Sequence, residues 1–210
     1  MTGTAQSGDF YIAGALTADD WRARKVALAA GGSAIWDSAF TDFFKTRLEL
    51  RYLHPIKLLQ DHGTFSGEGF SITAIQCTLI EFIAATRYGL NYRFVVPGAP
   101  PLGAHEYAKS GALFRDFLAA ELPFSAEFTA AVAQDFYASV RCGLLHEAST
   151  KNGWRIWARG SSIIDAANKM VYRDNLQAAI LDYVRLYGIA LRTDANLQAA
   201  FIRKFDSLAS

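Results

Sequence analysis

Apolar residues recur every three or four positions along most of the chain, a spacing that is typical of amphipathic helices. Period-two alternation, which would indicate strands, is confined to short pieces. The pattern therefore predicts a mainly α-helical, all-α class protein. The segments predicted to be helical are 18–29, 36–60, 70–88, 105–120, 125–140, 175–191 and 195–208.

Helix-terminating residues lie at several of these boundaries. Thr17 and Asp20 have the spacing of a capping box, and glycines 31–32 end the first helix. Pro55 should kink the second helix or split it into two. Gly89 is the expected stop of the third, and Ser125 the expected cap of the fifth. We expect these helices to form a single domain over residues 1–210.

Three segments fall outside the helical pattern. Residues 1–17 form a loose N-terminal lead-in, and 91–103 read as a connector with three of the five prolines. Residues 151–173, which we call the β flap, contain three short β-prone pieces separated by turn formers. A small hairpin or three-stranded flap is predicted there.

Composition narrows the class of protein further. With 51% apolar and 13% aromatic residues, the chain can bury a sizeable core. No uncharged stretch reaches the length of a bilayer span, and the N-terminus shows no signal peptide. Two cysteines provide no disulfide framework, and four histidines lack metal-ligand spacing. We expect a cytoplasmic protein with no membrane association, no metal and no cofactor.

Charge is concentrated in one region although the net charge is only +1. Residues 141–173 carry six Lys or Arg against two acidic residues, whereas residues 1–140 carry eleven against fourteen. A local excess of +4 favours a phosphate-bearing ligand. A solvated hairpin that happens to be basic is the equally weighted alternative.

Arg141 and His146 are the strongest candidates for chemistry. A guanidinium can bind the non-bridging oxygens of a phosphodiester, and an imidazole can take or give a proton near neutral pH. Five residues apart, they do not share one face of a straight helix. The two side chains would converge better if the helix ended or bent between them, which Gly143 permits.

The spacing alone is a weak signal, because a chain of this length contains such a match by chance. Arg47 and His54 provide a second one, in a segment that reads as core-facing helix. Glu81 lies inside an apolar helix, where a carboxylate is costly unless paired. A salt bridge to an arginine is the favoured role for Glu81, and a site acid facing a cleft is the alternative.

The context of the pair resembles a known family. The segment "FYASVRCGLLHEASTKNGWRIW" is similar to the signature of HEPN-domain proteins, an all-α superfamily with the motif Arg, four to six residues, His. Tyr137 lies in the aromatic helix that leads into Arg141, and His146 lies at the turn. The residue after the arginine is often polar in active members, whereas here it is Cys142.

The resemblance implies a HEPN-like helical bundle that forms a homodimer and cleaves RNA without metal, leaving a 2′,3′-cyclic phosphate. Arg141 and His146 would be catalytic. The supporting or substrate-binding residues would be Tyr137, Cys142, Glu147, Lys151 and Arg155. Many members serve as toxins, with an antitoxin partner, or in phage defence.

Two other features bear on function. Trp154, Trp157 and Tyr172 in the β flap either stack on RNA bases or pack the flap onto the helices. The alternative function is a non-catalytic HEPN-like binding or scaffold module for a nucleotide or a protein partner. In that case Arg141 and His146 would be structural.

Overall fold

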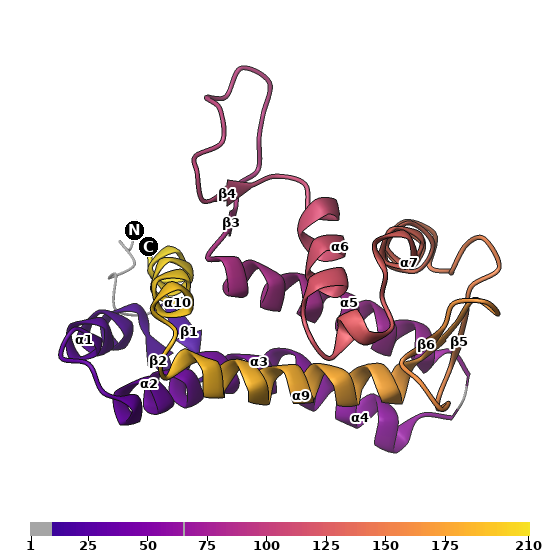
Figure 1. Cartoon of the computed structure of the whole chain (residues 1–210), viewed down its shortest axis with the longest axis horizontal. Coiled ribbons are helices and arrows are strands. Elements are labelled where there is room, and N and C mark those ends of the chain that lie inside the picture. Colours follow the sequence, from indigo (N-terminus) through magenta and orange to yellow (C-terminus); the bar gives the residue numbers. More distant parts are fainter. Residues whose placement is uncertain (1–9, 65) are drawn as a thin grey trace, which may run out of the picture. The chain divides into compact units, whose positions relative to one another are not determined.

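The computed structural model describes residues 10–64 and 66–210 and is mostly helical (Figure 1), as the apolar spacing predicts. The chain divides into two compact units. The first comprises the described part of Met1–Arg51 with Ala85–Ala108 and Leu186–Ser210, and the second comprises Tyr52–Ala84 and Lys109–Arg185. Each unit is described separately below.

The helical elements follow the predicted order with additional breaks. They are α1 (Ala18–Leu28), α2 (Ser33–Ala39), η1 (Phe40–Lys45), α3 (Thr46–Leu48), η2 (Glu49–Leu53), α4 (His54–His62), α5 (Glu68–Tyr88), α6 (Gly111–Ala120), η3 (Phe124–Ala126), α7 (Ala130–Phe136), η4 (Tyr137–Arg141), α8 (Cys142–Glu147), α9 (Arg173–Leu191) and α10 (Ala195–Leu208). The strands are β1 (Tyr11–Ala13), β2 (Leu16–Thr17), β3 (Asn91–Tyr92), β4 (Glu106–Tyr107), β5 (Arg155–Trp157), β6 (Ile164–Asp165) and β7 (Met170–Tyr172).

An aromatic cluster forms the core of the first unit. Trp21 of α1 is fully buried and lies 5.2 Å from both Phe43 and Phe205 between ring centroids. Its indole N–H donates to Asp206 at 3.0 Å, so the buried ring keeps a hydrogen-bond partner at its polar edge. Apolar burial and edge contacts of this kind hold α1 against α10.

The N-terminus of this unit is more ordered than predicted. Residues 11–17 form an antiparallel pair of strands, β1 and β2, and Ile12 and Ala13 are fully buried. The prediction of a loose lead-in is therefore wrong for residues 10–17, because a strand of only three residues gives too short a pattern to recognise. The rest of the lead-in lies outside the described residues.

Several predicted boundaries are confirmed. Thr17 caps α1 in a capping box with Asp20, and Gly89 follows α5 with a φ of 64°. Pro55 lies in the first turn of α4, where its missing N–H costs nothing. The π-helical segments η1 and η2 precede it, and nothing in the apolar spacing indicated them.

Two boundaries are wrong. The helix predicted from residue 105 begins at Gly111, because Glu106 and Tyr107 pair with Asn91 and Tyr92 as β4 and β3. Ser125 lies in the short 3-10 turn η3, and Thr129 caps α7 by accepting a hydrogen bond from the Val132 N–H. Both serine and threonine are good caps, so the sequence alone did not distinguish them.

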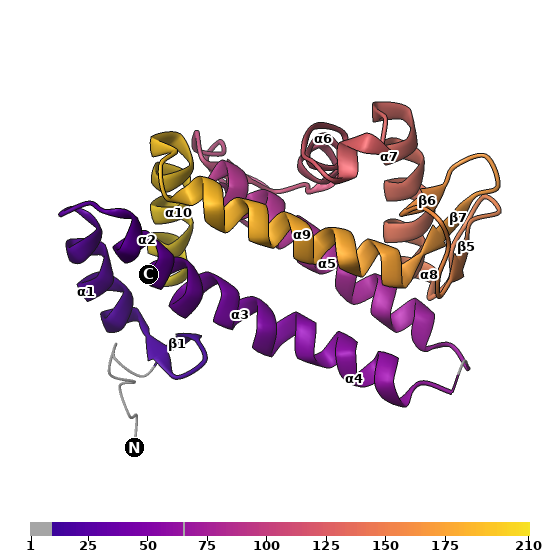
Figure 2. The ribbon, with the colours of Figure 1, turned by 60° about the horizontal axis from the view of Figure 1, so that its bottom comes forward.

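The β flap of the second unit is a three-stranded sheet, as predicted. Its order is β5-β7-β6, with β5 parallel and β6 antiparallel to β7, and Figure 2 shows it beside α7 and α8. Trp154 is buried, packs edge-on against Phe136 at 5.7 Å and donates its indole N–H to Asp135 at 3.0 Å. The backbone N–H of Lys151 donates to the Ser139 carbonyl at 2.8 Å. These contacts attach the flap to the helix that carries Arg141.

Among the described residues, one helix is long and apolar enough to cross a membrane by length and composition. It is α5, and 56% of its most apolar window is buried inside the protein. Burial of this kind is typical of the core helix of a soluble protein.

Candidate functional site

Arg141 lies at the end of η4, where it is fixed by residues of two other helices. Its Nη2 donates to the Glu81 carboxylate on α5 at 3.0 Å and approaches the Ser110 hydroxyl at 3.5 Å. The guanidinium lies 5.5 Å from the ring centroid of Tyr137, one turn earlier. The prediction that Glu81 pairs with an arginine is confirmed, and its partner is the motif arginine itself.

The pairing keeps Arg141 charged. Burial opposes the charge, but the hydrogen bond and negative charge of Glu81 outweigh it, so the pKa of Arg141 is raised above its ordinary value. The side chain is 19% exposed, and its Nε and Nη1 make no hydrogen bond with another described residue. Two sides of the guanidinium therefore keep donors for an anion.

His146 lies in the last turn of α8 and is exposed. Its imidazole has no hydrogen-bond partner among the described residues. Because the chain stays helical from Arg141 to His146, the five-residue step places the two side chains about 140° apart around the axis and about 7.5 Å along it. Within one chain, Arg141 and His146 therefore do not converge.

The helix does not end at Gly143, although the glycine would permit a bend there. α8 runs through Gly143 to Glu147, and the φ of 52° at Ala148 makes the left-handed turn that follows it. A Cβ on Gly143 would lie 2.5 Å from the Ser149 carbonyl oxygen, so glycine is needed for the close approach of the loop after His146. Glycine is needed at position 143 because the loop packs closely there, not because the backbone bends.

The predicted supporting residues are placed around this helix. Tyr137 contacts Arg141, as described, and Cys142 is half-buried directly after it. Exposed Glu147 and Lys151 form an ion pair at 3.0 Å, and Lys151 keeps the pKa of Glu147 below its ordinary value. Cys142 also lies near the buried Cys77, whose thiol pKa burial raises to about 12.

The positive charge of residues 141–173, the basic stretch of the sequence, is largely neutralised by neighbouring carboxylates. Within the described chain, five of its six cationic residues have a carboxylate oxygen within 4.0 Å. Arg155 is the exception, and its guanidinium donates to the Asn168 carbonyl inside the flap at 3.3 Å. The local excess of +4 is therefore a weaker indication of a phosphate ligand than the sequence count suggests.

The flap aromatics divide between the two roles considered for them. Trp154 is part of the core, so it packs and cannot stack on a base. Trp157 is 58% exposed, and Tyr172 is half-buried. Only Trp157 presents a large open ring from this part of the flap.

The second Arg/His match has a structural explanation. Arg47 donates to the backbone carbonyl of Ile12, which fastens β1 to the first unit. Among the described residues, no group of three or more His, Cys, Asp or Glu side chains is arranged to hold a metal ion.

Sequence reasoning missed a cavity in the same unit, formed where α5 and α9 begin. Gly67, Glu68 and Gly69 line it, and their neighbour Arg173 lies more than a hundred residues away along the chain. Comparison with known protein families, curated proteins and solved structures finds no match for this chain. Its class is thus defined by its own features: a mainly α protein in which a carboxylate-anchored arginine and an exposed histidine share one helix.

Proposed function

We propose that the protein is a metal-independent endoribonuclease in which Arg141 binds the phosphodiester and His146 transfers protons. The observation that carries the proposal is the anchoring of Arg141. Glu81 fixes its position and charge through one nitrogen, while Nε and Nη1 keep donors for phosphate oxygens. His146 has an exposed imidazole at the end of the same helical segment.

The chemistry follows from RNA itself. The 2′-hydroxyl oxygen attacks the adjacent phosphorus, its proton leaves to a base, and the bond from phosphorus to the 5′ oxygen breaks. The leaving oxygen takes up a proton, and the products are a 2′,3′-cyclic phosphate and a 5′-hydroxyl. His146 would serve these proton transfers, and Arg141 would offset the charge that develops on the non-bridging oxygens.

We further propose that two copies of the chain complete the site. Arg141 and His146 diverge on one helix, so a phosphate bound to Arg141 is out of reach of the histidine of the same chain. In a two-fold homodimer, the surface that presents His146 on one copy can face the surface that presents Arg141 on the other. This would give two composite sites per dimer.

The cellular role is part of the same proposal. A cytoplasmic ribonuclease of this kind would suit a toxin or a phage-defence protein, and a toxin would need an antitoxin partner. Cys142 stands where many active members of the resembled family have a polar residue, and a thiol donates only a weak hydrogen bond. Cys142→Asn is therefore expected to raise rather than lower the cleavage rate.

The test is RNA cleavage in EDTA by the wild-type protein and the Arg141→Ala and His146→Ala variants. Each variant should lose at least about 100-fold in rate. His62→Ala and Arg185→Ala are matched controls, since His62 is an exposed histidine and Arg185 an ion-paired arginine in the same unit. Absence of wild-type cleavage, or cleavage at the wild-type rate by both site variants, would refute the proposal.

The Arg141–Glu81 pair also favours a second candidate, a non-catalytic module that binds a nucleotide or a protein partner. A guanidinium paired with a carboxylate can be purely structural. In that case wild-type protein would bind RNA or a partner without cleaving it, and Arg141→Ala would lower stability as its main effect. Equilibrium unfolding beside the cleavage assay separates the two functions.

A further inference from the structure

The cavity at the beginning of α5 and α9 has the size of one aromatic ring. It has a volume of about 160 Å³ and is lined by Gly67, Glu68, Gly69, Phe70, Ile156, Trp157, Ala158 and Arg173. An apolar protein cavity of about 150 Å³ is large enough to bind benzene. A six-membered planar ring therefore matches this space.

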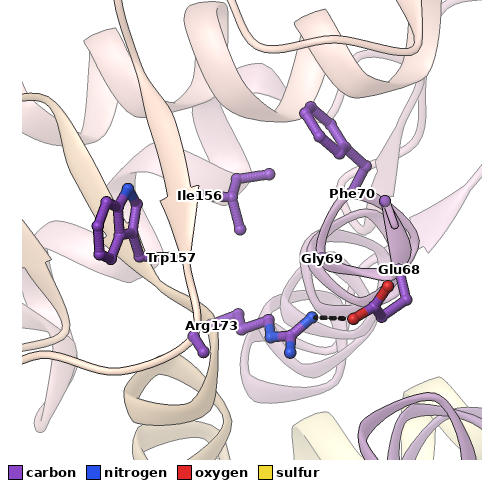
Figure 3. A pocket seen from close by; sticks show the side chains of 8 residues that line it. Glu68, Gly69, Phe70, Ile156, Trp157 and Arg173 are labelled. Atoms are coloured by element: carbon purple, nitrogen blue, oxygen red, sulfur yellow. Dashed lines mark ion pairs between the residues drawn. The ribbon is translucent and has the colours of Figure 1, made fainter. Parts of the chain in front are cut away.

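The walls are suited to a flat ligand. Figure 3 shows the side chains of Ile156 and Phe70 on opposite sides of the cavity, with the Arg173 guanidinium at its base. Phe70 is 41% exposed, so the ring is accessible from solvent. Trp157 borders the cavity but turns its ring to the other side of β5, as alternation along a strand requires.

Arg173 supplies polar recognition at the base of the cavity. Its side chain is only 8% exposed, and its Nε is buried with no hydrogen-bond partner among the described residues. The nearest carboxylate oxygens are those of Glu68 at 3.7 Å and Asp174 at 3.6 Å, beyond hydrogen-bonding distance. The guanidinium thus makes no hydrogen bond to another described residue, and an acceptor bound in the cavity would give one of its Nη groups a partner.

The charge balance indicates what kind of acceptor fits. Glu68 and Asp174 already offset the positive charge of Arg173, so an added phosphate would meet no net positive charge. A neutral carbonyl oxygen needs only a donor. A planar six-membered ring that carries carbonyl groups has both required properties, and the pyrimidine bases of RNA are such rings.

We propose that this cavity binds a pyrimidine base of the RNA substrate, with the ring between Phe70 and Ile156 and a base carbonyl on Arg173. The inference rests on the proposed function for its ligand. Gly69 and Glu81 are twelve residues apart on α5, so the cavity lies about 18 Å along the helix from the carboxylate that anchors Arg141. The base that it reads is thus several nucleotides from the cleaved bond.

The glycine at position 69 offers a clean variant. A Cβ there would lie 3.4 Å from both Arg173 Nη1 and Ile156 Cγ2, so Gly69→Ala adds a methyl group to the cavity without a severe clash. Substitution of buried Arg173 risks unfolding, whereas alanine at a helical position does not. Gly103→Ala is the matched control, with its Cβ also 3.4 Å from the nearest atom but outside the cavity.

The experiment is a titration of the full chain with uridine, cytidine, adenosine, guanosine and inorganic phosphate, followed by NMR. Uridine and cytidine should shift the resonances of residues that line the cavity, and Gly69→Ala and Phe70→Ala should weaken binding about tenfold or more. Gly103→Ala and Phe94→Ala, which removes an exposed ring elsewhere, should bind as wild type.

Three results would overturn the proposal: no pyrimidine binding, equally tight purine or phosphate binding, or unchanged binding by both cavity variants. None of them depends on RNA cleavage, because nucleosides have no phosphodiester to cut. RNA cleavage without pyrimidine binding would refute the base-binding proposal and leave the nuclease proposal standing. Pyrimidine binding without cleavage would remove the nuclease proposal and leave a base-binding module.

Discussion

At the scale of single residues, the proposed function depends on the pairing of Glu81 with Arg141. The two side chains are 21% and 19% exposed, so their charges are partly shielded from water and their attraction is stronger than that of a surface pair. A guanidinium that is already oriented loses less entropy when it binds an oxyanion.

Glu81→Gln should therefore affect both stability and activity. The amide keeps an acceptor but removes the charge, so unfolding free energy should fall by about 1–2 kcal/mol in chemical denaturation. RNA cleavage should fall by more than the loss of folded protein explains. A loss of stability with full activity would assign Glu81 a structural role only.

Asp135 gives a pH-dependent prediction. Hydrogen bonds from Ser139 and Trp154, with a smaller contribution from Lys169, keep the pKa of this carboxylate below its ordinary value of 3.8. A lowered pKa means that the carboxylate stabilises the folded state above pH 3.8, and that this stability is lost as pH falls through the folded pKa.

Asp135→Asn should cost about 1 kcal/mol at pH 7, a modest value because the side chain is 39% exposed. The difference from wild type should shrink as pH falls below 3.8, measured by urea unfolding at several pH values. A difference that stays constant down to pH 2 would show that Asp135 acts through its shape rather than its charge.

Sequence reasoning could identify Arg141, His146 and the need of Glu81 for an arginine, because each depends on local context. It could not place Arg173 beside Gly69, since nothing local links residues so far apart in the chain. It also overestimated the basic stretch, because carboxylates from distant segments neutralise most of it.

At the scale of elements, Gly143 and Gly69 show that the same residue type can have opposite roles inside helices. Replacement of a helical glycine by alanine ordinarily stabilises by about 0.5–1 kcal/mol. Gly69→Ala should follow that rule. Gly143→Ala should destabilise by about 1–3 kcal/mol, because its Cβ would meet the Ser149 carbonyl at 2.5 Å.

Thermal unfolding of the two variants beside wild type tests this contrast. Gly143→Ala should also lower RNA cleavage, since it displaces the loop that follows His146. Equal melting temperatures for both variants would contradict the close packing of this loop on α8.

The start of α7 gives a second prediction at this scale. Thr129→Ala should cost about 1 kcal/mol in unfolding free energy, because the Val132 N–H loses its acceptor. Ser125→Ala should be near neutral, since η3 uses no side-chain cap there. The reverse order in a denaturation experiment would place the helix start at Ser125.

Element positions were predictable where the spacing of apolar residues agreed with the capping and turn-forming residues at the ends, as in α1, α5, α10 and the three strands of the flap. They were not predictable where pairing between distant segments decided the structure, as for β3 with β4. The π-helical segment η4, which ends at Arg141, was also missed, because it leaves the apolar spacing almost unchanged.

At the scale of the whole molecule, the proposed site depends on two copies of the chain acting together. One chain presents Arg141 and His146 about 140° apart on a helix. A single chain therefore cannot bring both side chains to one phosphate. A two-fold dimer would bring the histidine of one copy to the arginine of the other, and each site would then need one intact residue from each chain.

Mixing the Arg141→Ala and His146→Ala variants tests this claim most directly. After subunit exchange, half of the dimers in an equal mixture pair one variant with the other, and each such dimer contains one intact composite site. The mixture should therefore recover about a quarter of wild-type RNA cleavage in EDTA, although each variant alone is inactive. No recovery, in a mixture shown to exchange subunits, would contradict a site shared between two chains.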